Sequence, residues 1–184
     1  QTEEPVVVLG VGRLNLQKDF STLIRAFAKA LLHKPLKLVI IGEGPERKKL
    51  ETLALELDVA DSVSLPGFVT NPSHYMKNAG LFVLSSAWEG LPNVLIEAMA
   101  CGVPVVSTDC PSGPAEILEN GKFGELVQVG DVVSLSQAIL KGIEKKKCAE
   151  YCRKLVERSG DFSTKSIVKK YFIEGKRKYT QIKN

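Results

Sequence analysis

The first loop that could do chemistry follows an apolar run near the start of the chain. Gly10 and Gly12 are followed by Arg13, and Lys18 stands five residues further on. Glycine lets the backbone approach a ligand closely, arginine offers a planar fork to phosphate oxygens, and lysine adds a mobile charge. A dinucleotide-binding fingerprint needs a third glycine where Asn15 stands, so that fingerprint fails. We expect the two cations to hold a diphosphate, with surface cations beside a tight turn as the alternative.

A second loop, within SSAWEGLPNVLIEA, carries two carboxylates eight residues apart. Glu89 precedes an expected helix, and Glu97 lies inside that helix among apolar neighbours. The first turn of a helix leaves backbone N–H groups free, and the helix dipole favours an anion there. We therefore expect Glu89 to take hydroxyl groups of a unit attached to that anion, and a buried Glu97 to bind ribose hydroxyls. The alternatives are a solvated Glu89 and a Glu97 that pairs with a basic residue.

Two further loops follow apolar runs and could contact a nucleoside. Gly42, Glu43 and Gly44 precede a helical pattern, and their glycines would permit close packing against a flat ring. Phe68 and Val69 combine an aromatic ring with main-chain groups that could meet the edge of a base. For each loop the alternative is an ordinary connection between a strand and a helix.

Short apolar runs alternate with helix-length segments along the chain. We expect strands at Val6–Gly10, Leu36–Gly42, Ser62–Pro66, Leu81–Ser85, Val103–Thr108 and Gly124–Val129, and helices at Ser21–Leu32, Glu46–Leu57, Val94–Cys101 and Val132–Gly142. Continuous apolar runs are typical of strands buried on both faces of a parallel sheet. The pattern predicts an α/β fold, a Rossmann-like doubly wound parallel sheet of about six strands flanked by helices. Ligands of such sheets bind at the carboxyl ends of the strands.

The composition of the 184 residues, 44% hydrophobic and 25% charged, fits one soluble globular domain and excludes a disordered or fibrous chain. No apolar run approaches the roughly 18 residues of a membrane span, and the acidic start does not resemble a signal peptide. The net charge is −5 over residues 1–140 and +9 over residues 141–184. We expect a basic helical tail over residues 148–184. Nucleic-acid binding is disfavoured because no reading motif accompanies the charge.

The four cysteines do not suggest a disulfide framework or a metal site. Cys101 and Cys110 flank an expected strand, and Cys148 and Cys152 share an expected helix. A zinc site needs four ligands, usually in tight pairs, and the chain has two histidines, which we take as ordinary surface or packing residues. Free thiols in a reducing compartment, and hence the cytoplasm, are expected.

Together these loops resemble the C-terminal, donor-binding half of GT-B-fold retaining glycosyltransferases of the group 1 kind. The matching segments are GRLNLQK, IIGEGPERKKL, GFV, SSAWEGLPNVLIEAMACGVPVVSTD and ENGKFGELVQVGD, in the family's order within residues 6–135. The resemblance implies that residues 1–147 form the nucleotide-sugar-binding domain. It also implies that the chain is half of an enzyme whose N-terminal domain is absent from it.

The resemblance assigns roles residue by residue. Arg13 and Lys18 would hold the donor diphosphate, Glu89 would be the catalytic acid that binds the donor sugar, and Glu97 would bind the ribose. The other donor-site residues that it implies are Gly12, Leu91, Asn93 and Val94 at the diphosphate, and Gly42, Glu43, Gly44, Phe68 and Val69 around the ribose and base. Pro92 stands where many members have glycine, and it has no N–H to donate.

The implied activity of the full-length enzyme is transfer of a hexosyl group, with retention, from a nucleotide diphosphate sugar. A UDP-sugar is favoured as donor, and a glycan or lipid-linked molecule as acceptor, in surface polysaccharide or glycoconjugate synthesis. No metal or other cofactor is expected. The isolated half should bind nucleotide without catalysing transfer. A cytoplasmic protein is expected, with peripheral attachment to the anionic inner face of the membrane as a further expectation.

Two other functions remain open at this point. One is a non-catalytic nucleotide-binding or interaction module, and the joint presence of Arg13, Lys18, Glu89 and Glu97 argues against such a degenerate site. The other is a GT-B epimerase or phosphorylase relative. A phosphorylase of this architecture would need a lysine for pyridoxal phosphate, and the loops offer no suitable one.

Overall fold

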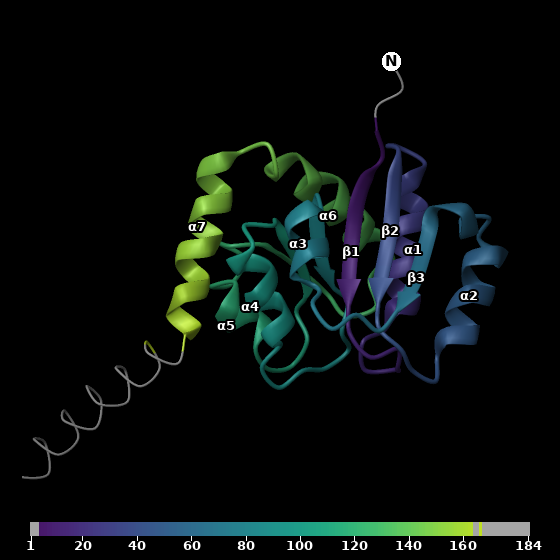
Figure 1. Ribbon diagram of the computed structural model, residues 1–184, viewed down its shortest axis with the longest axis horizontal. Helices are drawn as coiled ribbons and strands as arrows, with labels where there is room; N and C mark the ends of the chain where they lie inside the picture. The colour runs from purple at the N-terminus through teal and green to yellow at the C-terminus, as the bar shows by residue number, and fades with distance from the viewer. Residues whose placement is uncertain (1–3, 164–165, 167–184) are drawn as a thin grey trace, which may run out of the picture.

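A computed structural model describes residues 4–163 and 166, and within them six strands form one parallel sheet (Figure 1). The strands are β1 (Val6–Val11), β2 (Leu36–Ile41), β3 (Val63–Gly67), β4 (Leu81–Leu84), β5 (Val105–Thr108) and β6 (Glu125–Val127). Their order across the sheet is β3-β2-β1-β4-β5-β6, with every pairing parallel. This is the doubly wound order of a Rossmann-like sheet, as the alternating pattern predicts.

Helices cover both faces of the sheet (Figure 1). They are α1 (Phe20–Leu31), α2 (Arg47–Glu56), α3 (Ser73–Asn78), α4 (Asn93–Ala100), α5 (Pro114–Ile117), α6 (Val132–Lys145) and α7 (Ala149–Ser159), with short 3₁₀ turns at Ala60–Ser62 and Gly160–Phe162. Buried side chains of α1, α2 and α6 share one core cluster, and those of α3, α4 and α7 share the other. The sheet is therefore the middle of three layers, which explains why its strands are apolar on both faces.

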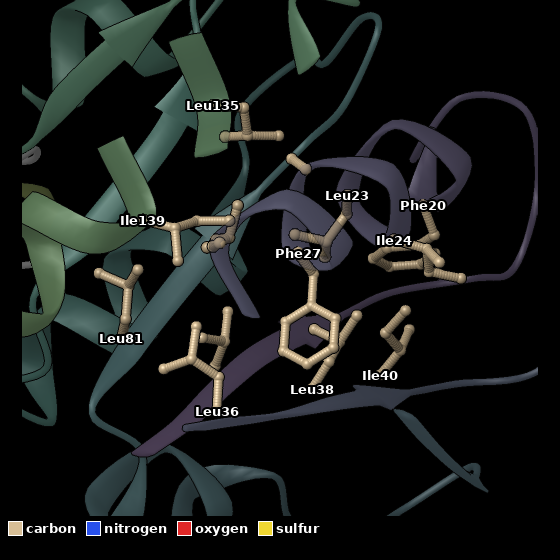
Figure 2. Close-up of a cluster of buried hydrophobic side chains, with 14 of the residues drawn as sticks. Phe20, Leu23, Ile24, Phe27, Leu36, Leu38, Ile40, Leu81, Leu135 and Ile139 are labelled. Atoms are coloured by element: carbon tan, nitrogen blue, oxygen red, sulfur yellow. The ribbon is translucent and has the colours of Figure 1, made fainter. Parts of the chain in front are cut away.

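Neighbouring strand residues serve opposite layers because successive side chains of a strand point to opposite faces. In β1, Val8 joins the α1 side and Leu9 the α4 side. Figure 2 shows the α1 side, where Phe27 of α1 packs over Leu38 of β2 and Ile139 of α6 approaches from the neighbouring helix. This double packing fixes the register, since a one-residue slip would turn every side chain to the wrong layer.

The strand order reverses between β1 and β4. The two strands pair through Val8 with Leu81 and Leu9 with Phe82, near the middle of β1. On its other side β1 pairs with β2 up to Val11 and Ile41. In doubly wound sheets this switch point, at the carboxyl ends of the strands, is where ligands bind. The loops after β1 and β4 are therefore the candidate ligand-binding loops.

The expected elements are confirmed to within a few residues at their ends, and the short helix α3 was not expected. The basic tail is described only in part: α7 packs against α4 through Leu155, while residues 164–165 and 167–184 of the tail lie outside the described residues. All four cysteines are free thiols. Within the described ranges, no helix has the length and apolar character needed to cross a bilayer.

Candidate functional site

The loops that follow β1 and β4 are bound to each other at the switch point. The backbone N–H of Ala87 donates to the carbonyl of Gln17 at 2.8 Å, and the Gln17 amide side chain donates to the carbonyl of Trp88 at 3.1 Å. The Ser85 hydroxyl donates to the carbonyl of Lys18 at 2.8 Å. Two segments about 70 positions apart in the chain thus form one surface.

This surface brings Lys18 and Glu89 into direct contact. The Lys18 Nζ lies 2.5 Å from Glu89 Oε1, and the Ser86 hydroxyl donates to the same oxygen at 2.6 Å. The Glu89 side chain is only 6% exposed and that of Lys18 is 16% exposed. A solvated loop carboxylate, the alternative for Glu89, is therefore excluded. The residues assigned to the diphosphate and to the sugar meet in one place.

Arg13 lies at the same end of the sheet with its guanidinium free. It is exposed, and among residues 4–163 and 166 no hydrogen-bond acceptor or carboxylate pairs with it. Gly12 has a local structural role, because a Cβ at this position would lie 3.0 Å from Lys18 Cε and 3.1 Å from Lys18 Cδ. The glycine thus makes room for the lysine stem, while Arg13 remains available to an anion.

The start of α4 carries backbone N–H groups without partners. Helix α4 is preceded by Pro92, which provides no side-chain cap. In the described part of the chain, the N–H groups of Gly90, Leu91 and Val94 donate to no carbonyl, whereas that of Asn93 donates to the Leu91 carbonyl at 2.9 Å. Leu91 and Val94 thus retain the donors assigned to them, and Gly90 adds one. The backbone N–H of Asn93 is already hydrogen-bonded and is not available to a ligand.

The expectation that Glu97 is buried is wrong. Glu97 is exposed, as is Asn93 one turn earlier, whereas Leu95, Ala98 and Met99 are buried against the sheet. The apolar neighbours in sequence lie on the other side of the helix, because successive residues turn by about 100° around its axis. Pairing with a basic residue is also excluded within the described ranges, so the carboxylate is open to solvent.

Gly42 and Gly44 pack against backbone. A Cβ on Gly42 would lie 1.9 Å from the Gly12 carbonyl oxygen, and one on Gly44 would lie 2.3 Å from the Leu14 carbonyl oxygen. The Leu14 N–H donates to the carbonyl of Glu43 at 2.9 Å. These contacts favour the alternative of a structural connection for the two glycines, which hold the first loop against the end of β2.

A cavity of about 480 Å³ opens at the carboxyl ends of β1, β2 and β3. It is lined by Val11, Gly12, Arg13, Ile41, Gly42, Glu43, Phe68, Val69, Thr70 and Pro72. The Phe68 side chain is 75% exposed although it is large and apolar. The cavity joins residues from three separate motifs, and an exposed ring at its edge could stack on a flat group.

One residue of this region, Arg47, was missed by the sequence reasoning. It binds Glu43 with two hydrogen bonds, at 2.6 Å to Oε1 and 2.9 Å to Oε2, and donates to the Leu65 carbonyl at 3.2 Å. The Arg47 guanidinium holds the pKa of Glu43 below its usual value. Glu43 is thus an ionised carboxylate tied to α2 and β3, and its four-residue spacing from Arg47 was the available signal.

The arrangement offers partners for three kinds of chemical group at the carboxyl ends of the strands. The cavity offers an apolar, partly aromatic wall for a flat ring. Arg13 and the free amides of Gly90, Leu91 and Val94 offer donors for an anion. The buried Glu89 offers acceptors for hydroxyl groups beside that anion. A flat ring, an anion and a polyol in sequence are the parts of a nucleoside diphosphate sugar.

Comparisons with known proteins agree with this geometry. The family model described as "Glycosyl transferases group 1" matches residues 1–159. A glycosyltransferase of Methanocaldococcus jannaschii is 33% identical over 94% of this chain and 50% of its own length. The N-acetylgalactosamine-N,N'-diacetylbacillosaminyl-diphospho-undecaprenol 4-alpha-N-acetylgalactosaminyltransferase of Campylobacter jejuni is 42% identical over 76% of this chain and 38% of its own length.

Solved structures show the same fold. A TarM variant from S. aureus, crystallised with fondaparinux, alpha-GlcNAc-glycerol and UDP, superposes with a TM-score of 0.83 at 28% identity. The match covers 94% of this chain and 35% of TarM. The chain thus spans half or less of the length of the relatives that it matches.

Proposed function

The chain belongs to the glycosyl transferases group 1 family, and on that basis we propose that it binds the nucleotide sugar donor of a retaining glycosyltransferase. A UDP-sugar is the proposed donor and a hexosyl group is the unit transferred. A second domain, outside this chain, would bind the acceptor. The whole protein would act in the synthesis of surface polysaccharide or another glycoconjugate.

One observation carries this proposal: the contact between Lys18 and Glu89 lies beside the unpartnered amides at the start of α4. A cation, free N–H groups and an ionisable acid are thereby collected at the switch point of the sheet. A purely structural ion pair would not require free backbone donors beside it. The free backbone donors therefore favour a donor-binding site of an enzyme over the alternative of a non-catalytic module.

Each part of the donor has a proposed place. The base and ribose would occupy the cavity beside Phe68, with Glu97 on the exposed side of α4 reaching the ribose hydroxyls. The diphosphate would lie between Arg13 and the amides of Leu91 and Val94. Glu89 would bind hydroxyls of the sugar. This order follows the direction from β2 and β3 across β1 to β4.

The chemistry proposed for this half is stabilisation of the leaving group. When the bond between the anomeric carbon and the diphosphate breaks, negative charge accumulates on the diphosphate oxygens. Preorganised donors at that point lower the barrier, because they need no reorganisation as the charge develops. Arg13, Lys18 and the α4 amides would supply them without a metal ion. The acceptor and its deprotonation belong to the whole protein.

Two relatives support the choice of UDP and of a lipid-linked acceptor. The TarM structure contains UDP. The Campylobacter relative is named for a diphospho-undecaprenol acceptor and an N-acetylgalactosaminyl group. A lipid-linked acceptor would bring the whole protein to an anionic membrane surface, where the basic end of the chain would favour attachment. We propose this peripheral location together with the acceptor.

Calorimetry of the 184-residue chain with UDP, GDP and ADP tests the donor assignment. We expect UDP to bind with a dissociation constant at least about tenfold below those of GDP and ADP, a difference of about 1.4 kcal/mol. The matched control is Lys37→Ala, which removes an exposed lysine from the opposite end of β2 and should leave UDP binding unchanged. Absence of binding by all three nucleotides would refute the donor site.

A further inference from the structure

In the described structure Lys18 contacts Glu89, and the diphosphate of the proposed donor would replace this contact. Its ammonium contacts Glu89 Oε1 at 2.5 Å, whereas the proposed donor places a diphosphate within its reach. Both side chains are largely withdrawn from solvent, so this charge-assisted contact is stronger than an exposed surface pair. A diphosphate that binds here must therefore compete with Glu89 for the lysine.

Glu89 has a second donor that does not depend on Lys18. The Ser86 hydroxyl, which is fully buried, donates to the same Oε1 at 2.6 Å. Within the described residues, Glu89 Oε2 has no hydrogen-bond partner and is not shut off from solvent. One oxygen of the carboxylate is thus anchored, and the other is open to a ligand.

The chain beneath Glu89 is fixed at several points. The Thr108 hydroxyl donates to the carbonyl of Ser86 at 2.6 Å, and the backbone N–H of Glu89 donates to the carbonyl of Pro111 at 3.2 Å. The lysine, by contrast, ends a flexible four-carbon stem that lies across Gly12. If the contact between Lys18 and Glu89 opens, the lysine is the partner that moves.

We propose that Lys18 exchanges Glu89 for the diphosphate when the donor binds, and that Ser86 is the positioning residue that keeps Glu89 in place for the sugar. This inference rests on the proposed function. After the exchange, Lys18 contacts the diphosphate, Ser86 still donates to Oε1, and sugar hydroxyls donate to the carboxylate. A nucleoside diphosphate without a sugar draws Lys18 away from Glu89 but supplies no hydroxyl groups that could donate hydrogen bonds to the carboxylate. The exchange thus makes the site prefer the complete donor.

Glu89→Gln tests the exchange directly. The amide keeps the shape of the side chain and removes its charge, so Lys18 becomes free for the diphosphate. In calorimetry on the 184-residue chain, UDP should bind this variant about fivefold more tightly than it binds the wild type. The preference for UDP-glucose, UDP-galactose, UDP-N-acetylglucosamine or UDP-N-acetylgalactosamine over UDP should disappear. Unchanged or weaker UDP binding by Glu89→Gln would overturn the exchange.

Ser86→Ala tests the positioning role. It should weaken the preferred UDP-sugar about fivefold, and Ser86→Thr, which keeps the hydroxyl, should restore most of the affinity. The control is Ser107→Ala, which removes an equally buried hydroxyl that donates to the Thr108 carbonyl at 2.8 Å and does not touch Glu89. Equal losses in the two alanine variants would show a merely structural role. If Ser86→Ala does not fold, Ser86→Cys takes its place, because a thiol keeps nearly the same shape and is only a weak hydrogen-bond donor.

Failure of the proposed function and failure of the exchange give different binding results. If it binds neither UDP nor any of the four UDP-sugars, the proposed function fails and the inference fails with it. If it binds them and the Glu89 and Ser86 variants bind as the wild type does, the donor site stands and the exchange is wrong.

Discussion

The Gly42 Cα lies so close to the backbone of Gly12 that a Cβ on Gly42 would stand 1.9 Å from the Gly12 carbonyl oxygen. Gly42 also has a φ of +147°, a conformation that residues with a Cβ rarely adopt. The contact seats the first loop on the end of β2, where the Gly42 N–H also donates to the Gly67 carbonyl at 2.9 Å. This close backbone approach thus explains why position 42 is occupied by glycine.

Gly42→Ala should therefore destabilise the domain strongly. The new methyl group must push the two backbones apart, so we expect a loss of about 3 kcal/mol or more in the free energy of unfolding. Urea denaturation followed by circular dichroism measures it. The matched control is Gly130→Ala, where φ is +77° but no atom lies within 4 Å of the new Cβ, and where strain alone should cost about 1 kcal/mol. Equal losses would contradict the steric explanation.

Arg13→Ala should weaken nucleotide binding without affecting stability. The guanidinium is exposed and has no partner in the described residues, so its removal leaves no group unsatisfied. We expect a loss of about tenfold in UDP affinity by calorimetry, because a charge-assisted contact to phosphate disappears. Arg25→Ala, which removes an exposed arginine from α1, should change neither property. A drop in melting temperature as large as that of a core variant would point to a structural role for Arg13.

Phe68→Leu should reduce the affinity for the nucleoside part of the ligand. The substitution keeps an apolar side chain at the edge of the cavity and removes the aromatic face. Base stacking on an aromatic ring is worth about 1–3 kcal/mol, so we expect uridine and UDP to lose about fivefold or more in affinity. Leu55→Ala, at another strongly exposed apolar side chain, serves as the control. Unaltered uridine binding would place the base elsewhere.

Tyr151→Phe should change the response of the domain to alkali. Burial raises the pKa of Tyr151 to about 12, whereas a tyrosine in the unfolded chain titrates near its usual pKa of 10.0. Between these values the unfolded chain loses the phenolic proton more readily, so stability falls as the pH rises from about 10 to 12. Tyr151→Phe should remove that part of the decline, although it also loses the hydrogen bond to the Phe123 carbonyl at 3.1 Å.

Urea denaturation of both proteins at pH 8, 10 and 11.5 measures the difference. The gap between wild type and variant should narrow as the pH rises, because only the wild type carries the raised pKa. Parallel curves over the whole range would show that Tyr151 titrates normally in the folded chain.

The sequence predicted most of the fold because the local composition of a segment indicates whether it forms a strand buried on both faces. Runs such as Val6–Gly10 and Leu81–Leu84 are apolar throughout, which is typical of strands covered on both faces. Short elements such as α3 escaped prediction, because a helix of 6 residues leaves too little periodicity. For Glu97 the sequence misled, since apolar neighbours in the chain do not show which side of a helix a residue occupies.

By itself, the sequence determined the alternation of strands and helices and the residue types of the site: two cations, two acids and an aromatic ring among glycines. The tertiary structure alone decided which of them meet. Lys18 and Glu89 are 71 residues apart and touch because the strand order places β1 beside β4. That adjacency arises from the packing of whole strands between two layers of helices, and no local pattern of residues encodes the resulting contact.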